Sequence, residues 1–201
     1  LTINLDENGF IGIEIEEVGP GSYDNCSEVQ LGLGSLSQTI FNCEDLGTNI
    51  VTMTISDAAG NTSSCEAIIT VLDKITPILT CQQEMTVNTD PGECGAYVTL
   101  PEAQASDNCG LKSFQSRYRP IDEDEDPIGD FSAWADDHSG FFEAGSYEIQ
   151  WKAGDESNNY SYCALILDVI DQEAPEVVCQ DITIQVDENG QASISATAIN
   201  N

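Results

Sequence analysis

An internal repeat is the feature that most constrains this chain. The triplet Asp-Asn-Cys occurs at Asp24–Cys26 and again at Asp107–Cys109. Each triplet is followed by a longer signature in which Asp, Asn, Cys, Asp, Pro and Cys recur at the same spacing. This signature runs over Asp57–Cys81 in the first copy and over Asp155–Cys179 in the second. A unit repeated in tandem indicates an array of similar domains rather than one large domain.

The beginning of the unit also recurs. Thr2–Gly9 reappears nearly unchanged as Thr183–Gly190, and Thr86–Asp90 carries a related segment between them. The copies begin about 85 to 97 residues apart, a length that suits a small domain with a single core.

These copies predict the division of the chain into three units. We expect a repeat at 1–73, a repeat at 74–171 and the start of a third, incomplete repeat at 172–201. On this interpretation Leu1 enters a repeat after its opening Pro and Cys, and Asn201 lies partway through another repeat. The chain would then be a fragment of a longer array.

The charge of the chain is strongly unbalanced. It holds 36 Asp and Glu against 5 Lys and Arg, a formal net charge of -31. Such a surface repels nucleic acid and anionic membranes and favours cationic partners. Disordered chains can be equally acidic, but here hydrophobic residues reach 40% and alternate regularly. We therefore expect a folded protein that binds no nucleic acid and does not insert into a membrane.

The cysteines indicate an oxidising compartment. There are eight, an even number at repeated spacings, which is typical of disulfides. Zinc is the alternative, but the chain has a single histidine, His138, and no Cys-x-x-Cys pair. We expect all eight cysteines in disulfides. They are Cys26, Cys43, Cys65, Cys81, Cys94, Cys109, Cys163 and Cys179.

Short runs of alternating apolar and polar residues predict β-strands throughout. Val51 and Met53 should face one side of a strand while Thr52 faces the other. A turn at 56–64 should join this strand to a returning one, and the second unit should repeat the hairpin with a turn near 154–159. Strands of this kind separated by turns are typical of a β-sandwich.

The signature resembles a known extracellular module. The string Asp57–Cys65, with Asp-Asn-Cys upstream and Asp-x-x-x-Pro plus Cys downstream, resembles the hyalin repeat, an immunoglobulin-like β-sandwich. Leu46–Thr54 is similar to the penultimate strand of the version found in giant surface adhesins of bacteria, including gliding bacteria. The resemblance covers the chain apart from 120–140. It implies tandem all-β immunoglobulin-like sandwiches arranged end to end, with about seven strands each.

The same resemblance implies a location and a role. Hyalin repeats belong to proteins that are secreted or displayed on the cell surface, where their role is adhesive or structural. The resemblance implies no catalytic residues, and we predict that this chain is not an enzyme.

Acidic and amide side chains fall in loops that share one pole of such a sandwich. In the second unit these are Asp107, Asn108, Asp155 and Asn159, and the incoming linker adds Asp73. Oxygen ligands converging from three segments are what Ca²⁺ requires, so they predict a calcium site at the joint between units one and two. The alternative is that Asp and Asn only stabilise turns by bonding their own backbone. Repetition of the spacing fits both interpretations.

Two further sets of residues are equivalent to this site. The pole of repeat one carries Asp24, Asp57 and Asn61, and the joint between repeats two and three carries Asp171 and Glu173.

Residues 120–142 form an insertion that only the second unit has. Asp122–Asp126 departs from the EF-hand pattern after its last residue, so we favour a solvated acidic loop. We expect Lys112, Arg117 and Arg119, on the strand leading into the insertion, to neutralise it.

The open alternative for this insertion is a private calcium site or a ligand-facing loop that binds glycan or protein. Aromatic residues near or within it would support a sugar-binding surface, although aromatic residues of a sandwich more often belong to the core or fill a loop. They are Tyr118, Phe131, Trp134, Phe141 and Phe142. Trp134, Asp124 and Asp126 would then contact the ligand.

Placed in sandwiches of this type, the cysteines suggest four pairs. Two would lie within a domain at its upper pole, Cys26–Cys65 and Cys109–Cys163. Two would bridge successive domains, Cys43–Cys81 and Cys94–Cys179.

Catalysis has little support in the sequence, because it shows no nucleophile motif and its only histidine lies in the acidic insertion. We predict a structural segment of a bacterial surface adhesin, a stalk or filament stiffened by disulfides and Ca²⁺. Its partners would be neighbouring repeats of the same chain. The alternatives are a module that binds cell-surface glycans or matrix through 120–142, and an accessory domain of a secreted enzyme.

Overall fold

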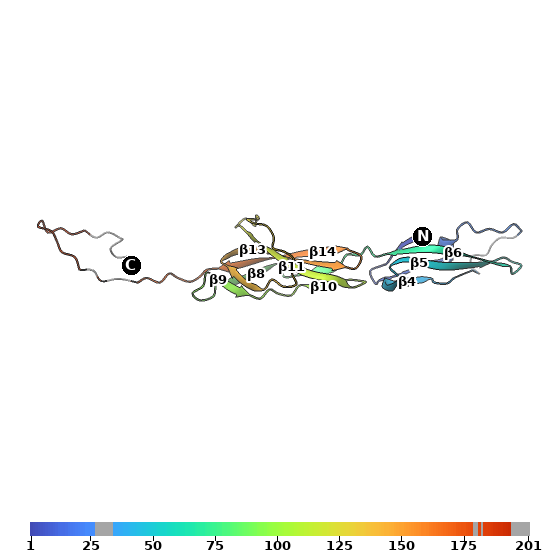
Figure 1. Ribbon diagram of the computed structural model, residues 1–201, viewed down its shortest axis with the longest axis horizontal. Helices are drawn as coiled ribbons and strands as arrows, with labels where there is room; N and C mark the ends of the chain where they lie inside the picture. Colours follow the sequence, from blue (N-terminus) through green and yellow to red (C-terminus); the bar gives the residue numbers. More distant parts are fainter. Residues whose placement is uncertain (27–33, 179–180, 182, 194–201) are drawn as a thin grey trace.

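The computed structural model describes residues 1–26, 34–178, 181 and 183–193. These residues form strands β1 to β14, with one turn of α-helix, α1 (Ile15–Val18), and a short 3-10 helix, η2 (Cys43–Asp45). Two β-sandwiches lie end to end along the long axis of the molecule (Figure 1). The predicted class, all-β with tandem immunoglobulin-like sandwiches, is confirmed.

The first sandwich has a four-stranded sheet in the order β1-β6-β5-β3 and a facing pair, β2 and β4. Strand β1 runs parallel to β6, whereas the other pairs are antiparallel. The strands are β1 (Thr2–Asn4), β2 (Phe10–Gly12), β3 (Ser35–Leu36), β4 (Ile40–Asn42), β5 (Gly47–Ser56) and β6 (Thr62–Leu72).

The second sandwich repeats this plan with longer strands. Its four-stranded sheet has the order β11-β13-β14-β8, and the pairs β12-β9 and β10-β7 complete it. Strand β8 runs parallel to β14, as β1 does to β6. The strands are β7 (Ile78–Thr80), β8 (Glu84–Asn88), β9 (Gly95–Val98), β10 (Gln104–Ser106), β11 (Leu111–Ile121), β12 (Gly140–Glu143), β13 (Gly145–Asp155) and β14 (Tyr160–Ile170).

The alternation predicted from the sequence determines which residues are buried. In β5, Val51 and Met53 are buried and Thr52 is exposed, because successive side chains of a strand point to opposite faces. In β13, Ile149 and Trp151 are buried in the same way. Both predicted hairpins are confirmed.

Each sandwich has its own hydrophobic core. In the first, Phe41, Val51, Ile69 and Val71 are fully buried and belong to one cluster. The second core is a separate cluster that includes Ile149, Trp151, Leu165 and Leu167. Burying one such aliphatic or aromatic side chain contributes about 1.5–3 kcal/mol, so each sandwich has an independent source of stability.

The two main sheets pair their strands in the same register. Gly47 lies opposite Val71 in the first sandwich, and Gly145 lies opposite Val169 in the second. Asp73, which follows β6, is therefore equivalent in space as well as in sequence to Asp171, which follows β14. The shared register therefore shows which residues of the first sandwich correspond to which residues of the second.

Candidate metal centre at the joint between the sandwiches

Three carboxylates gather where the two sandwiches meet. Asp73 lies directly after β6, Asp107 lies in the loop after β10, and Asp155 is the last residue of β13. One carboxylate oxygen from each lies within 4.8 Å of the others. Only 6% of Asp73 and 1% of Asp155 are exposed to solvent. The structure thus brings together the three acidic segments that the sequence places at this joint.

Asp73 and Asp107 each use one carboxylate oxygen in their own turn, whereas Asp155 uses both. Asp73 Oδ1 accepts a hydrogen bond from the Ile75 backbone N–H at 3.0 Å, and Asp107 Oδ1 accepts one from the Cys109 N–H at 2.9 Å. Asp155 accepts from the Asn159 backbone N–H at 2.8 Å and from its side-chain amide at 2.7 Å. Turn stabilisation is therefore part of what these residues do.

The remaining oxygens are not explained by turns. Asp73 Oδ2, Asp107 Oδ2 and Asn108 Oδ1 are buried and have no hydrogen-bond partner. The Asn108 amide nitrogen donates to the Asp6 carbonyl at 3.2 Å and to Asp73 Oδ1 at 3.3 Å, which fixes the amide orientation and leaves its oxygen as an acceptor. An unsatisfied buried polar atom costs about 1–3 kcal/mol, and more when it is charged.

The electrostatics of the joint favour a positive charge beside the carboxylates. Burial, and then the negative charges of Asp73 and Asp155, raise the pKa of Asp107 above its ordinary value. The ion pairs formed by the described residues, Lys112–Glu156 and Arg119–Glu148, do not involve these carboxylates. Carboxylate and amide oxygens without competing donors are the ligands that Ca²⁺ takes. The residues present therefore fit a calcium ion.

The same residues connect the sandwiches. The Asn159 side-chain amide donates to the Asp73 carbonyl at 3.2 Å, and the Ser161 hydroxyl donates to the Pro77 carbonyl. These bonds fasten the linker to the β13–β14 hairpin of the second sandwich.

A disulfide crosses the joint beside the carboxylates. It links Cys43, in η2 of the first sandwich, to Cys109 in the Asp107 loop of the second, with Cα atoms 5.3 Å apart. The second disulfide, Cys81–Cys163, lies within the second sandwich and ties the segment after β7 to β14.

These bonds correct the predicted pairings. The predicted pairs Cys109–Cys163 and Cys43–Cys81 are wrong, because the bonds are Cys43–Cys109 and Cys81–Cys163. Cys109 lies at the end of the second sandwich that contacts the first, within reach of Cys43. Cys163 lies along β14, opposite Trp151, where Cys81 reaches it. The prediction that Cys43 forms a bridge between domains was right in kind and wrong in partner.

The other predicted pairs have different outcomes. Cys26–Cys65 is also wrong, since both cysteines are exposed and unpaired. Cys94 is exposed and unpaired among the described cysteines, but Cys179 lies outside the described residues, so Cys94–Cys179 stays untested.

The equivalent poles hold acidic turns without a third carboxylate. Asp57 accepts hydrogen bonds from the Asn61 backbone at 2.8 Å and side chain at 2.7 Å, which lower its pKa. Asp24 accepts from the Cys26 N–H at 2.9 Å. At the far end, Asp171 accepts from the Glu173 N–H at 2.9 Å. Among the described residues, only the Asp73 joint gathers three such ligands.

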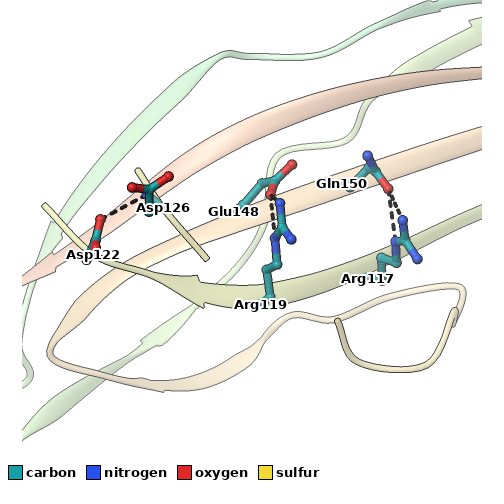
Figure 2. A network of polar contacts seen from close by, with 6 residues as sticks. All are labelled: Arg117, Arg119, Asp122, Asp126, Glu148 and Gln150. Carbon is teal, nitrogen blue, oxygen red and sulfur yellow. Dashed lines mark hydrogen bonds and ion pairs between the residues drawn. The ribbon is translucent and has the colours of Figure 1, made fainter. Parts of the chain in front are cut away.

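The cations beside the insertion do not neutralise it, contrary to the prediction. Figure 2 shows Arg119 paired with Glu148 and Arg117 bonded to Gln150, both across the β11–β13 ladder. Asp122 is instead bonded to the backbone of its own turn, at Asp126. Both Arg side chains instead contact an aromatic ring of the insertion. The guanidinium groups of Arg117 and Arg119 lie 3.9 and 4.2 Å from the centre of the Phe131 ring.

The aromatic residues of the insertion are engaged in these contacts. The Arg117 guanidinium lies 3.9 Å from the Phe131 ring centre and 4.3 Å from that of Trp134. Trp134 is half-buried, and Phe142 belongs to the core. The other predicted ligand residues, Asp124 and Asp126, are exposed in the acidic turn. A role for these rings in the core or in filling the loop was predicted, but their contacts with Arg were not, although the interleaved Arg and aromatic residues were a signal for them.

Comparison with known proteins identifies no family. No family model matches the chain, and no curated protein matches it either. Solved structures match at low similarity. One is "Protocadherin Gamma B7 extracellular cadherin domains 1-4", with 17% identity and a TM-score of 0.32 over 94% of this chain and 54% of that one. The chain thus spans about half the length of that solved chain.

Two further solved structures match with similarly low identity and TM-score. The fibronectin(III)-like modules of Clostridium thermocellum CbhA match with 11% identity and a TM-score of 0.33, over 88% of this chain and 94% of that one. The insect immune protein hemolin matches with 16% identity and a TM-score of 0.31, over 61% of this chain and 29% of that one. In the part of the chain that the structure describes, no helix is long and apolar enough to cross a bilayer.

Proposed function

We propose that this chain is a structural segment of an extracellular bacterial adhesin of the hyalin type, in which Ca²⁺ stiffens the joint between successive sandwiches. One observation carries the proposal: three buried oxygens at the joint, on Asp73, Asp107 and Asn108, have no hydrogen-bond partner. Three neighbouring carboxylates without a cation would repel one another across the contact between the sandwiches. With Ca²⁺ the same oxygens would become ligands.

The joint would then be fixed at two points. The Cys43–Cys109 disulfide attaches the second sandwich to η2, and by itself it leaves rotation about the bridge. A cation held by Asp73 from the linker and by Asp107 and Asp155 from the second sandwich adds a second attachment. Two separated attachments remove the hinge motion that is the default between domains, so the segment can project a binding tip or carry tension.

The proposal includes the repeat units at 1–73, 74–171 and 172–201 and a non-catalytic role. Neighbouring repeats of the same chain are the expected partners, at the cell surface or in a secreted protein. We favour this role over ligand binding by 120–142, because Trp134 and Phe131 of that loop are already covered by Arg117 and Lys152.

Calcium binding is tested by thermal unfolding with and without EDTA. Extracellular modules bind Ca²⁺ at roughly 10⁻⁴–10⁻³ M, and a ligand at 100 times its Kd stabilises the folded state by about 2.7 kcal/mol. We expect the melting temperature of the wild type to rise with added Ca²⁺. Asp107→Asn should abolish the rise, whereas Asp122→Asn, in the exposed acidic turn, should retain it. Equal calcium responses in both variants would contradict the site.

A further inference from the structure

The two outer ends of this molecule carry complementary halves of the joint between the sandwiches. The joint has a socket, defined as Cys43 and Asp73 at the end of the first sandwich. It also has a plug, defined as the Asp107–Cys109 loop and the Asp155–Asn159 turn of the second.

The outer end of the first sandwich reproduces the plug. Cys26 donates its N–H to Asp24 Oδ1 at 2.9 Å, as Cys109 does to Asp107 at 2.9 Å. Asn61 bonds Asp57 through backbone and side chain at 2.8 and 2.7 Å, the same distances as Asn159 to Asp155. A hollow lies between the two loops, and Cys26 forms part of its lining. These loops lie at the end of β6 opposite to Asp73.

The outer end of the second sandwich reproduces the socket. Asp171 follows β14 as Asp73 follows β6, and its Oδ1 accepts the same backbone bond, from Glu173 at 2.9 Å. The residue equivalent to Cys43 is Ala144, because each is the first residue after the strand that pairs with β2 or β9. Ala144 has no thiol, so a disulfide like that of the joint needs another sulfur.

Cys94 supplies that sulfur from the neighbouring strand. Cys94 directly precedes β9, as Gly9 directly precedes β2. Its carbonyl accepts a hydrogen bond from the Ala144 N–H at 2.8 Å, so the two residues lie side by side. In the first sandwich the corresponding neighbours are Gly9 and Cys43, and a Cβ built on Gly9 would lie 2.8 Å from Cys43 Sγ. In the first sandwich the cysteine of this neighbouring pair follows β4, and in the second it precedes β9. The two cysteines therefore lie at the same corner of their sandwiches.

We propose that the Cys94 and Asp171 end is a docking surface for the plug of a second unit of this chain's own type, to which it becomes bonded through Cys94 and Cys26. The occupied joint is the template, since there the same two surfaces are in contact and their cysteines are bonded. Cys26 and Cys94 are both exposed. The contact is heterologous, head to tail, and so extends into a filament rather than closing as a dimer.

The bond forms by oxidation of two thiols. Glutathione disulfide accepts the two electrons and is reduced to two glutathione thiols, while Cys26 and Cys94 lose their protons and form the S–S bond by thiol–disulfide exchange. The inference rests on the proposed function and deepens it by naming the partner of the Cys94 and Asp171 end.

Three variants of the 201-residue chain test the pairing, each keeping one of the unpaired thiols. All carry Cys179→Ser. The first offers Cys26 alone (with Cys65→Ser and Cys94→Ser), the second offers Cys94 alone (with Cys26→Ser and Cys65→Ser), and the third offers Cys65 alone (with Cys26→Ser and Cys94→Ser). Cys65 is the matched control because it is also exposed on the first sandwich. The Cys94 variant is mixed with each of the others in a glutathione redox buffer containing Ca²⁺, and the products are mapped by mass spectrometry.

We expect the Cys26–Cys94 dimer to exceed the Cys65–Cys94 dimer by about tenfold or more, which corresponds to about 1.4 kcal/mol of docking free energy. Equal yields, or a mixture dominated by Cys26–Cys26 and Cys94–Cys94 dimers, would overturn the proposal. Selective Cys26–Cys94 bonding in a chain whose melting temperature does not respond to Ca²⁺ would support the docking surface and contradict the calcium role. Loss of selectivity in a chain whose melting temperature still rises with Ca²⁺ would contradict the docking surface and support the calcium role.

Discussion

At the residue scale, the joint is shaped by a carboxyl group with a raised pKa, Asp107, and by one position without a side chain, Gly9. Asp107 shares the site with Asp73 and Asp155, and its pKa is raised because burial and two negative charges disfavour its ionised form. Gly9 has φ +78°, and a Cβ there would lie 2.8 Å from Cys43 Sγ and 2.9 Å from the Asn108 carbonyl oxygen. Both features follow from the close approach of the two sandwiches.

The raised pKa of Asp107 predicts the pH dependence of the calcium-free chain. The folded state binds this proton more tightly than the unfolded state, so the stability that the proton contributes is present below the ordinary value of 3.8 and lost as pH rises through the raised pKa. The pKa of Asp57 is lowered, so its contribution is lost only as pH falls below 3.8. In EDTA, unfolding midpoints should therefore decrease as pH rises from acidic values above 3.8 toward neutrality. Asp107→Asn should weaken this dependence, and an unchanged slope in that variant would contradict the assignment.

Gly9 gives a second prediction with a matched control. Gly9→Ala and Gly60→Ala both place a side chain at positive φ, +78° and +87°, which costs about 1–2 kcal/mol. The new methyl group meets nothing within 4 Å at Gly60 but meets Cys43 Sγ and backbone at Gly9. Chemical denaturation should show a larger loss for Gly9→Ala, together with weaker calcium binding. Equal losses and unchanged calcium affinity would show that the joint tolerates the methyl group.

At the element scale, strands were predictable and the contacts of loops were not. Alternation identified the β5–β6 and β13–β14 hairpins because one face of each strand is buried. The disulfide partners of Cys109 and Cys163 were predicted wrongly, since sequence spacing places both near one pole but does not say which neighbour each side chain faces. The gathering of Asp73, Asp107 and Asp155 was predicted, because three separate segments of the sequence carried them. The burial that favours a cation over simple turns is visible only in the structure.

The insertion yields a prediction at this scale. Trp134 lies against Arg117 and Lys152, at 4.3 and 4.6 Å from its ring centre, and such contacts are worth about 0.5–2 kcal/mol each. Trp134→Ala should speed amide hydrogen exchange in 127–138 and lower stability by about 1–2 kcal/mol, while calcium binding at the joint stays unchanged. Tyr23→Ala, at an exposed aromatic residue of the first sandwich, is the control. Unaltered exchange in the Trp134 variant would mean that the ring does not anchor the loop.

At the scale of the whole molecule, a chain with a net charge of -31 gains from a rod rather than a compact arrangement, because separated like charges repel less. Two attachments hold that rod at the joint, the Cys43–Cys109 disulfide and the proposed cation. The disulfide closes a loop of about 66 residues, which contributes about 4 kcal/mol in the loop-entropy description. It therefore contributes to stability as well as to geometry.

Stiffness should fail only when both attachments are lost. Each attachment alone leaves a pivot but keeps the two sandwiches in contact. Spin labels on exposed strand positions Thr52 and Tyr162, one in each sandwich, would report the distance distribution between them. We expect a narrow distribution with Ca²⁺, a modestly broader one in EDTA or in Cys43→Ser/Cys109→Ser, and a broad one in the double variant in EDTA. A narrow distribution in the last sample would show that direct packing, such as the Asn159 and Ser161 bonds to the linker, holds the joint without either attachment.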